Sequence, residues 1–451
     1  MSFMQWKRAV RLFHPRQLLS IFGLGSLLLL AACGGGSSPK EMLPTYYPGD
    51  AVVPVTGPDV VGAQPFDTAV STLLKKWNIP GATVTVAKNG QLVLARGYGY
   101  ADFEAKELMK PDTMLRIGSN SKILTSMAVL HLKDQGLINL DTKFLQILTQ
   151  FQVASGGDLR LRDITIRDLL RHSGGWDRDK SGDPLSFQGT ISHALGIPMP
   201  VLCPDVIRYM MGQPLDFAPG SKQVYSNLGY CILGRVIEKV SGQPYELYVR
   251  NNVLAPMDVH AMSIGYSHDI GQQGPYESKY YEYNGAPLYD SVFPDLGKVP
   301  LSYGGIEMLT LDAPGGWIGS AIDLTRVLTA VDGSRTGPFL SATTMMEYTA
   351  DPGLPDWNTD QNYWYGLGIF VGPDPQTWYH GGSISGTESQ LLRDSNGYTW
   401  CIMTNSESSD AGALHQELGS TMRQALGSGL QESAKDLYPQ FLSPPLPPRT
   451  K

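Results

Sequence analysis

IGSNSKILTS, residues 117–126, places a serine and a lysine one helical turn apart at the start of an apolar helical stretch. Ser119 and Lys122 share one face of that predicted helix, because residues three positions apart are neighbours on a helix surface. The first turn of a helix has free backbone N–H groups and the positive end of the helix dipole, which favour developing negative charge. A lysine whose pKa is lowered by burial or by a nearby cation can take the serine proton, so the pair predicts an activated nucleophile.

Alone, this spacing has little specificity. Ser37 and Lys40 have the same spacing, but they lie in a segment rich in Gly and Ser where it predicts nothing. The alternative for Ser119 is a helix N-cap beside a solvated lysine. The other motifs of the chain, and their order, decide between the two interpretations.

Strand patterns occupy both ends of the folded part of the chain, and helical patterns occupy its middle. Residues 81–100 alternate around Asn89-Gly90, which is typical of a type I′ hairpin turn. The pattern predicts an α/β protein of the α+β type, with an antiparallel sheet flanked by helices and an inserted all-helical region. Residues 265–305 show no periodicity and predict a long surface loop. Helices are expected at about 67–77, 119–135, 165–172, 226–241, 321–331 and 411–425.

Two further motifs follow in an order that suits the serine–lysine pair. PGSKQVYSNLGYCILG contains Tyr225-Ser226-Asn227 in the helical part, and TWYHGGSISG contains His380-Gly381-Gly382 on a predicted late strand. Together with Ser-x-x-Lys, these are the three elements of the serine β-lactamase and penicillin-binding superfamily. Over about residues 66–425 the chain resembles the class C β-lactamase-like serine hydrolases, which include β-lactamases, D-amino-acid peptidases and esterases. The stretches that carry this resemblance are IPGATVTVAKNG, ITIRDLLRHSGG, APGSKQVYSNLGYCILGRVIEKVSGQPY, GGWIGSAIDLTRVL and YHGGSISGTES.

The resemblance implies a β-lactamase/transpeptidase-like fold and three catalytic residues. Ser119 would attack a carbonyl carbon and become acylated. Lys122 and Tyr225 would share the general-base work, since a nearby ammonium stabilises a phenolate. Core packing is the alternative for Tyr225. The sequence contains no Gly-x-Ser-x-Gly pentapeptide that would supply a rival nucleophile.

The resemblance also implies a set of substrate-binding residues. They are Asn227, His380, Gly381, Gly382 and Ser383. Asn227 would orient the lysine and bind the acyl side of the substrate, although it can also serve as a helix cap. The backbone N–H groups of Ser119 and Ser383 would form the oxyanion hole. His380 and Gly381 would line the strand edge beside the substrate, with a structural role as the alternative for the histidine.

The late-strand motif departs from that of β-lactamases, which place Lys-Thr-Gly there. His380 is mostly neutral near pH 7 and Gly381 has no hydroxyl, so the cation and hydroxyl that can bind a substrate carboxylate are missing. Losing such a charge-assisted contact, worth about 1.5–3 kcal/mol, disfavours carboxylate-bearing substrates. Ester hydrolysis is therefore favoured over D-amino-acid amide or peptide hydrolysis and over weak β-lactamase activity. A non-catalytic lipoprotein that binds cell-wall fragments is the alternative from another class of function.

The N-terminus has the pattern of a bacterial lipoprotein signal. A basic start precedes the apolar run 18–32, which at about 15 residues is short for a transmembrane helix. Leu-Ala-Ala-Cys at residues 30–33 resembles the lipobox, which implies cleavage before Cys33 and attachment of lipid to it. An ordinary signal peptide is the alternative. An acylated Cys33 would hold the chain at a membrane surface without spanning the membrane.

The sequence thus predicts four segments. They are a signal peptide 1–32, a flexible tether 33–65, a hydrolase domain 66–426 with a helical insertion at about 123–310, and a Pro-rich tail 427–451. The expected location is the bacterial cell envelope, and Gly34 after the cysteine fits the periplasmic face of the outer membrane in a Gram-negative cell. The expected partners are a small ester, amide or D-amino peptide substrate and a membrane surface, while the oligomeric state stays open.

The composition is that of a folded protein unsuited to nucleic acid. Apolar residues make up 42% of the 451 residues and aromatic residues 10%. The formal charge is −7, and the first 32 residues carry four basic side chains and no acid, so the remainder has a charge of −11. A chain this acidic repels phosphate backbones, and its sequence shows no basic stripe.

Cysteine and histidine spacing predicts neither a metal site nor a cofactor. The sequence has no paired Cys/His spacing and no His-Glu-x-x-His. Besides the lipobox cysteine, Cys203, Cys231 and Cys401 remain, and three cannot all pair within one chain. Cys231 and Cys401 lie in apolar runs, which favours buried free thiols, with a Cys203–Cys231 disulfide as the alternative.

Overall fold

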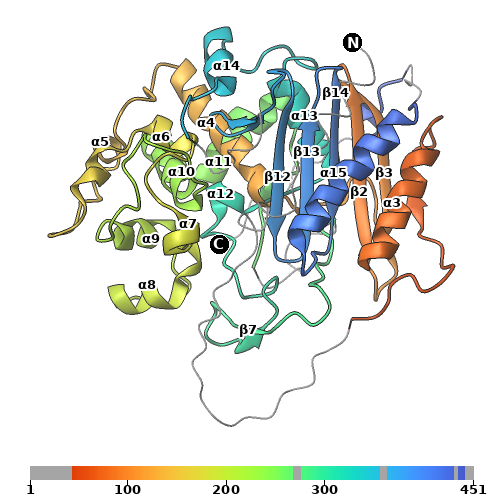
Figure 1. Ribbon diagram of the computed structural model, residues 1–451, viewed down its shortest axis with the longest axis horizontal. Coiled ribbons are helices and arrows are strands. Elements are labelled where there is room, and N and C mark those ends of the chain that lie inside the picture. The colour runs from red at the N-terminus through yellow and green to blue at the C-terminus, as the bar shows by residue number, and fades with distance from the viewer. Residues whose placement is uncertain (1–42, 268–275, 356–362, 431–434, 442–451) are drawn as a thin grey trace.

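The computed structural model describes residues 43–267, 276–355, 363–430 and 435–441 (Figure 1). The predicted signal peptide, Cys33 and the final residues 442–451 lie outside this described part. Within it, no helix combines the length and apolar character needed to cross a membrane.

Strands from both ends of the described chain pair in one antiparallel sheet, which confirms the predicted fold class (Figure 1). At its centre, β2 (Gly81–Lys88) pairs with β14 (Tyr398–Thr404), and Val84 lies opposite Ile402. Over the described residues, nine strands join this sheet in the order β1-β3-β2-β14-β13-β12-β11-β10, with β4 beside β3. The other bounds are β1 Val55–Thr56, β3 Gln91–Asp102, β4 Glu107–Leu108, β10 Trp364–Tyr365, β11 Phe370–Val371, β12 Trp378–Ile384 and β13 Thr387–Arg393.

The turn between β2 and β3 is the hairpin predicted at Asn89-Gly90. The φ angle is 48° at Asn89 and 80° at Gly90. A type I′ turn requires positive φ at both central residues, and its backbone twist matches that of the flanking strands. This local signal therefore sets the register of the first two long strands.

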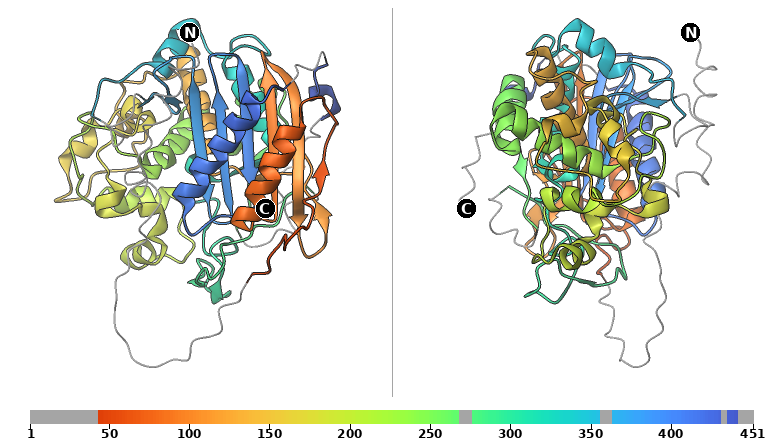
Figure 2. Two further views of the ribbon diagram at one scale, coloured as in Figure 1. Left: turned by 45° about the vertical axis from the view of Figure 1, so that its right-hand side comes forward. Right: turned by 90° about the vertical axis from the view of Figure 1, so that its left-hand side faces the viewer.

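Helices from the two ends of the chain cover one face of the sheet. α3 (Gln64–Trp77) packs against α15 (Ala411–Gly427), and Figure 2 (left) shows both lying across the strands. Their apolar sides share a core with the sheet; its buried members include Phe66, Val70, Leu74, Ile402, Leu418 and Met422. The opposite face is covered by α13 (Ala321–Val331), where Thr85 Oγ1 donates to Ala321 O at 3.1 Å.

A helical region lies beside the sheet, built around α4 (Ser121–Asp134) and α10 (Asn227–Ser241). Most residues of both helices are buried, so each is a core helix rather than a surface one. α10 ends before Gly242, which has φ 70° as expected of a C-terminal glycine. The other helices are α5 Phe144–Ile147, α6 Ile166–Leu170, α7 Arg178–Ser181, α8 Gln188–Leu195, α9 Cys203–Met210, α11 Tyr245–Val249, α12 Asp312–Gly315 and α14 Ala342–Thr349.

Two small sheets lie apart from the main sheet. β5 (Leu115–Arg116) and β6 (Ser263–Ile264) pair with β9 (Trp317–Gly319), and β7 (Tyr289–Asp290) pairs with β8 (Lys298–Val299). The β7–β8 hairpin interrupts the predicted surface loop 265–305. That prediction is also wrong for the neighbouring tyrosines at positions 280 and 281, which are buried.

The tether predicted up to residue 65 is wrong for its described part. Tyr46, Tyr47 and Val53 are buried, and β1 adds a strand at the sheet edge. The ring of Tyr46 packs edge-on against Phe103 and Tyr281, with centroid distances of 4.8 and 5.6 Å. The Pro and Gly content is that of a tether, but the aromatic rings among them bury enough apolar surface to order the chain.

The folded part also continues past the predicted end at residue 426. Leu437 is buried, and its backbone N–H donates to Leu92 O at 2.9 Å. Tyr438 is buried as well, with the guanidinium of Arg335 4.0 Å from its ring centroid. These contacts place the segment 435–441 on the sheet domain, before the Pro-rich end of the chain.

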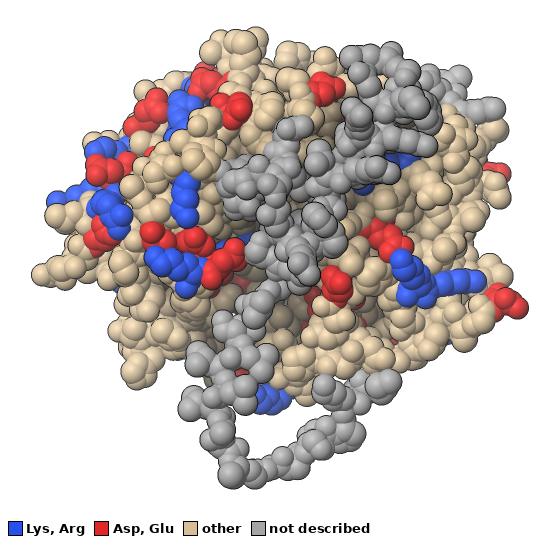
Figure 3. Space-filling model, viewed as in Figure 1, with Lys and Arg blue, Asp and Glu red and all other residues tan. Residues whose placement is uncertain are grey.

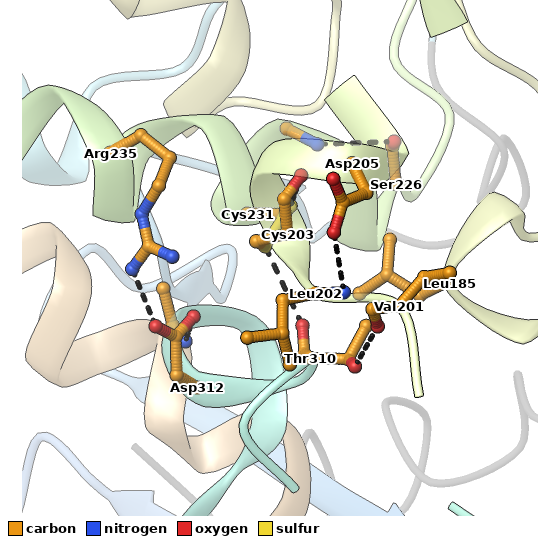
Figure 4. The surroundings of a disulfide bond; sticks show 12 residues. Leu185, Val201, Leu202, Cys203, Asp205, Ser226, Cys231, Arg235, Thr310 and Asp312 are labelled. Atoms are coloured by element: carbon orange, nitrogen blue, oxygen red, sulfur yellow. Dashed lines mark hydrogen bonds and ion pairs between the residues drawn. A yellow bond between two sulfur atoms is a disulfide. The ribbon is translucent and has the colours of Figure 1, made fainter. Parts of the chain in front are cut away.

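Cys203 of α9 and Cys231 of α10 form a disulfide in the helical region (Figure 4). The free-thiol interpretation is therefore wrong for Cys231, because packing of α9 against α10 brings together two cysteines separated by 28 positions. Cys401 is buried and free, as predicted. The disulfide lies beside Thr310, whose carbonyl oxygen is 3.5 Å from Cys203 Sγ.

Charged side chains of both signs are interspersed on the face that Figure 3 shows. Ion pairs of the helical region include Lys143–Asp163 at 2.6 Å and Arg167–Asp141 at 2.7 Å. Basic side chains form no continuous stripe among the described residues visible on this face.

Candidate active site

Ser119 lies in a 3-10 turn, η2 (Gly118–Asn120), directly before α4. Its side chain is only partly buried, whereas the residues on either side of it are buried. Asn120 ties the turn to the sheet, because its Nδ2 donates to Ser389 Oγ of β13 at 2.8 Å. The serine is thus held on a rigid turn between a core helix and the sheet.

Lys122 is fully buried, and its Nζ has three hydrogen-bond partners. They are Ser119 Oγ at 3.1 Å, Asn227 Oδ1 at 2.8 Å and Pro314 O at 2.7 Å. The amide and peptide oxygens can only accept, so Nζ donates to both of them. A neutral amine has two hydrogens, which leaves its lone pair directed at the serine hydroxyl. The arrangement therefore suits proton transfer from Ser119 to Lys122.

The surroundings of Lys122 favour its neutral form. Burial lowers the pKa of the ammonium well below its usual range, and the nearby Arg178 guanidinium lowers it further. The carboxylate of Asp183 acts in the opposite direction. A lysine with a lowered pKa can act as a base near neutral pH, which an ordinary lysine cannot.

Tyr225 lies just before α10 and brings its phenol to the same place. Its ring centroid is 4.6 Å from Lys122 Nζ, and it makes a side-chain hydrogen bond with Ser119. Burial raises the pKa of the phenol, while the bond to Ser119 and the guanidinium of Arg178 act to lower it. Because burial dominates, the geometry favours Lys122 as the proton acceptor and Tyr225 as a neutral phenol that can pass a proton on.

Asn227 contacts Lys122 rather than capping its own helix. The N-cap of α10 is Ser226, whose Oγ accepts from Gly229 N at 3.4 Å. The side chain of Asn227 accepts from Lys122 and donates from Nδ2 to Asp183 Oδ2 at 2.6 Å. Its amide thus joins the buried lysine to a carboxylate.

His380 is buried on β12 and is held as a neutral imidazole. Its Nδ1 lies 2.7 Å from Gly381 O, which can only accept, so Nδ1 carries the proton. Nε2 then accepts from the Tyr365 hydroxyl at 3.2 Å. Burial and the nearby Lys122 lower the pKa of His380 to about 3. This residue supplies no cation to the site near pH 7.

Strand β12 runs directly against the turn that holds Ser119. A Cβ on Gly382 would lie 2.0 Å from Ile117 O, so only glycine allows this approach. A Cβ on Gly118 would lie 2.8 Å from the backbone nitrogen of Ser383. The amide of Ser383 is therefore close to the turn of the serine, where an oxyanion-hole donor is expected.

Three more charged or titratable residues contact the site residues predicted from the sequence. They are Arg178, Asp183 and His415. Arg178 lies with its guanidinium carbon 4.8 Å from the centroid of the Tyr225 ring. Asp183 binds the asparagine amide, and His415 lies against Gly381. The charge-rich loop WDRDKSGDP (176–184), just after the family-like stretch ending in RHSGG, is the signal that points to the first two. Nothing local in the sequence around His415 marks it.

His172 packs against the ring of Tyr225. It is buried, and its Nδ1 accepts from Ser226 N at 3.2 Å. Its ring centroid lies 4.3 Å from that of Tyr225. Burial and Lys122 lower the pKa of His172, so the ring packs as a neutral imidazole.

Comparison with known proteins identifies the family. The sequence model of the Beta-lactamase family matches residues 66–419. Protein flp of Staphylococcus aureus (strain COL) is 31% identical over 246 residues, which are 53% of this chain and 45% of flp. The chain thus spans less than half the length of the curated relatives it matches.

Solved structures that share the fold include a hydrolase and an amidase. EstCE1, a hydrolase with promiscuous acyltransferase activity, matches with a TM-score of 0.61 and 21% identity over 80% of this chain and 98% of its own. The D-amino acid amidase from Ochrobactrum anthropi SV3 matches with a TM-score of 0.60 and 19% identity over 80% of this chain and 99% of its own. Because the family model covers well over half of the sequence, the chain belongs to the β-lactamase family.

Proposed function

We propose that this protein is a serine hydrolase that forms an acyl-enzyme on Ser119 and acts mainly on esters with neutral acyl groups. The observation that carries the proposal is the environment of Lys122. Two obligate acceptors take its hydrogens, so the lone pair of the neutral amine faces Ser119 Oγ, 3.1 Å away. A nucleophile paired with an oriented base is the arrangement that covalent hydrolysis requires.

The reaction has two halves. Ser119 Oγ attacks the ester carbonyl while its proton passes to Lys122 Nζ, and the oxyanion is met by the backbone N–H groups of Ser119 and Ser383. The tetrahedral intermediate collapses, the C–O bond to the leaving group breaks, and the alkoxide takes the proton from Lys122 through Tyr225. Water then attacks the acyl carbonyl carbon and gives a proton to the same base. The second tetrahedral intermediate collapses, the bond from the acyl carbon to Ser119 Oγ breaks, and the base returns its proton to Oγ, which releases the carboxylic acid and free Ser119.

The substrate preference rests on the late strand. His380 is neutral and Gly381 has no side chain, so β12 offers no charge-assisted contact to a substrate carboxylate. Such a contact is worth about 1.5–3 kcal/mol, or one to two orders of magnitude in affinity. β-Lactams and peptide C-termini carry this carboxylate, whereas simple esters do not.

Hydrolysis of D-amino-acid amides is the second candidate, and Asp183 favours it. Its carboxylate lies beside Asn227, the residue expected on the acyl side, where an ammonium group on the acyl chain would find a counter-charge. The fold is also shared with a D-amino acid amidase. Weak β-lactamase activity and non-catalytic binding of cell-wall fragments are the remaining alternatives.

The test follows turnover by a form that starts at Gly34 and by its Ser119→Ala variant. Hydrolysis of p-nitrophenyl butyrate, a chromogenic cephalosporin and D-alanine amide is measured side by side. Ester turnover that disappears in Ser119→Ala, with little cephalosporin cleavage, is the expected result. Faster cephalosporin or amide turnover would replace the ester assignment, and the absence of all three would favour a binding protein.

We further propose that Cys33 is lipidated and anchors the protein in the bacterial cell envelope. The Cys203–Cys231 disulfide supports an extracytoplasmic location, because disulfides persist in oxidising compartments. Cys33→Ser should move the protein from the membrane to the soluble fraction after cell lysis. A variant that stays with the membranes would contradict the anchor, and separation of inner and outer membranes would test the outer-membrane location.

A further inference from the structure

Asp183 holds two parts of the site together. It lies at the N-terminal end of the 3-10 turn η4 (Pro184–Ser186), where Oδ1 accepts from Leu185 N at 3.1 Å. Its other oxygen, Oδ2, accepts from Asn227 Nδ2 at 2.6 Å. The side chain therefore fixes its own turn with one oxygen and the amide of Asn227 with the other.

The carboxylate decides which way the amide of Asn227 faces. An ionised carboxylate only accepts hydrogen bonds, so the NH₂ group of Asn227 must point to Asp183. Its carbonyl oxygen must then point to the opposite side, where Lys122 Nζ lies 2.8 Å away. Without the carboxylate, the amide has no comparable reason to prefer this orientation over the flipped one.

The orientation of the amide in turn directs the lone pair of Lys122. With Oδ1 facing it, the neutral amine gives its two hydrogens to Asn227 Oδ1 and Pro314 O, and its lone pair is left for the hydroxyl of Ser119, whose Oγ lies 3.1 Å from Nζ. If the amide were flipped, its NH₂ would face Nζ, and the neutral amine would turn its lone pair away from the serine. In the hydrogen-bond chain Asp183–Asn227–Lys122–Ser119, the donor and the acceptor at each link are therefore fixed by the carboxylate of Asp183.

The turn that carries Asp183 is itself held by the helical core. Leu185 is buried, and η4 contacts both α9 and α10, next to the disulfide that joins these helices (Figure 4). The carboxylate is therefore presented from a fixed position rather than from a free loop end.

We propose that Asp183 is the positioning residue that orients the general base Lys122 through Asn227. This inference rests on the proposed function, since it assigns Lys122 the role of base. Asp183 touches no reacting atom in this mechanism. Its carboxylate fixes the amide of Asn227 in one of two possible orientations. Because the lone pair of Lys122 then already faces Ser119, proton transfer requires no reorientation of these side chains.

The isosteric variant Asp183→Asn tests this role. The introduced amide keeps one acceptor oxygen for Leu185 N, but its NH₂ then faces Asn227 and favours the flipped orientation of that residue. We measure the rate at which a fluorophosphonate labels Ser119, located by mass spectrometry, over a range of pH. Labelling at the pH-independent plateau should be about 10- to 100-fold slower than in the wild type.

Two further variants separate orientation from charge and from folding. Asp179 is exposed on the neighbouring helix α7, so Asp179→Asn removes an equal charge without touching Asn227 and should label like the wild type. In Asp183→Asn/Asn227→Asp the new carboxylate accepts from both neighbours, which restores the direction of the chain and should recover at least about 10-fold of the lost rate.

The pH profile excludes a merely structural role. Asp183 raises the pKa of Lys122, so Asp183→Asn should move the acidic limb to lower pH while the plateau falls. In the double variant a carboxylate touches Nζ, and the limb should move to higher pH. The inference would be overturned if Asp183→Asn were labelled at the plateau rate of the wild type. It would also be overturned if the double variant were labelled no faster than Asp183→Asn. A wild type that is not labelled at Ser119 would overturn the proposed function and the inference with it.

Discussion

The imidazole of His415 occupies the space that a side chain on Gly381 would need. A Cβ on Gly381 would lie 2.4 Å from His415 Cε1 and 2.8 Å from Nε2. His415 comes from α15, and its Nδ1 lies 3.4 Å from a carboxylate oxygen of the buried Glu388. A helix residue thus fills the space that a threonine side chain at position 381 would need.

Introducing the hydroxyl of a threonine at this position should require removal of the histidine. Gly381→Thr alone should lower both stability and ester turnover, because β12 or His415 must shift by more than a few tenths of an ångström. Gly381→Thr/His415→Ala should fold and raise cephalosporin cleavage relative to ester turnover by about 10-fold, the value of one hydrogen bond to a carboxylate. The ratio of kcat/KM for the two substrates is the measurement. His415→Ala alone is the control; if it shifts the ratio equally, the hydroxyl is not responsible.

Removal of the guanidinium of Arg178 should shift the pH dependence of turnover. The cation lowers the pKa of Lys122, and the base must be neutral to act, so kcat/KM rises with pH through that pKa. In Arg178→Gln the pKa of Lys122 increases, and the acidic limb should move to higher pH. Turnover is then lost at low pH and retained on the plateau.

A charge change elsewhere on the same helix provides the control for Arg178. Lys180 is exposed and pairs with Asp216 at 3.2 Å, away from the lysine and tyrosine. Lys180→Gln removes the same charge from α7 and should leave the acidic limb of the pH dependence of kcat/KM unchanged. Equal shifts in both variants would mean that only the net charge of the loop matters.

The motif residues could be predicted because each is marked by a short local pattern. Ser119 and Lys122 are three positions apart, and Asn227 follows Tyr225 at a helix start, so order along the chain was enough to group them. Their mutual contacts depend on α4 packing against α10, which the two apolar helical patterns already favour. The start of the sheet was predictable for the same reason, since the β2–β3 hairpin carries the Asn89-Gly90 turn.

Arg178 and Asp183 could not be placed from sequence, because the loop between α6 and α8 takes its shape from distant contacts. Asp177 N donates to Asp216 Oδ2 at 2.9 Å, and Ser181 Oγ donates to Oδ1 at 2.6 Å. Composition likewise misjudged residues 43–65, where burial of individual aromatic rings outweighs the Pro and Gly content. In each case a few long-range contacts override the average character of the segment.

Gly118→Ala should abolish most activity. Gly118 has φ 52°, and a Cβ there would lie 2.8 Å from Ser383 N, so the turn of Ser119 and strand β12 must separate. Displacing one oxyanion-hole donor costs about 10²- to 10³-fold in kcat. Ester kinetics of the purified variant check this, with unchanged KM as the expected companion result.

Gly136→Ala is the control for the effect of backbone strain without a steric clash. Gly136 also has positive φ, 72°, but a Cβ there meets nothing within 4 Å. Its substitution should lower stability by about 1 kcal/mol and leave kcat unchanged. If Gly136→Ala lost as much activity as Gly118→Ala, the close approach of Ser383 would not be the cause.

The disulfide should contribute about 2–4 kcal/mol to stability, because it closes a loop between residues 28 positions apart and so restricts the unfolded chain. Urea denaturation of Cys203→Ala/Cys231→Ala should show a free energy of unfolding that is lower by this amount, with the midpoint at a correspondingly lower urea concentration. Dithiothreitol should shift the wild type to the same midpoint and leave the double variant unchanged. Cys401→Ala, which removes a buried free thiol, should retain the response to dithiothreitol. A wild type that unfolds at the same urea concentration with and without reductant would show that the bridge does not stabilise the native state.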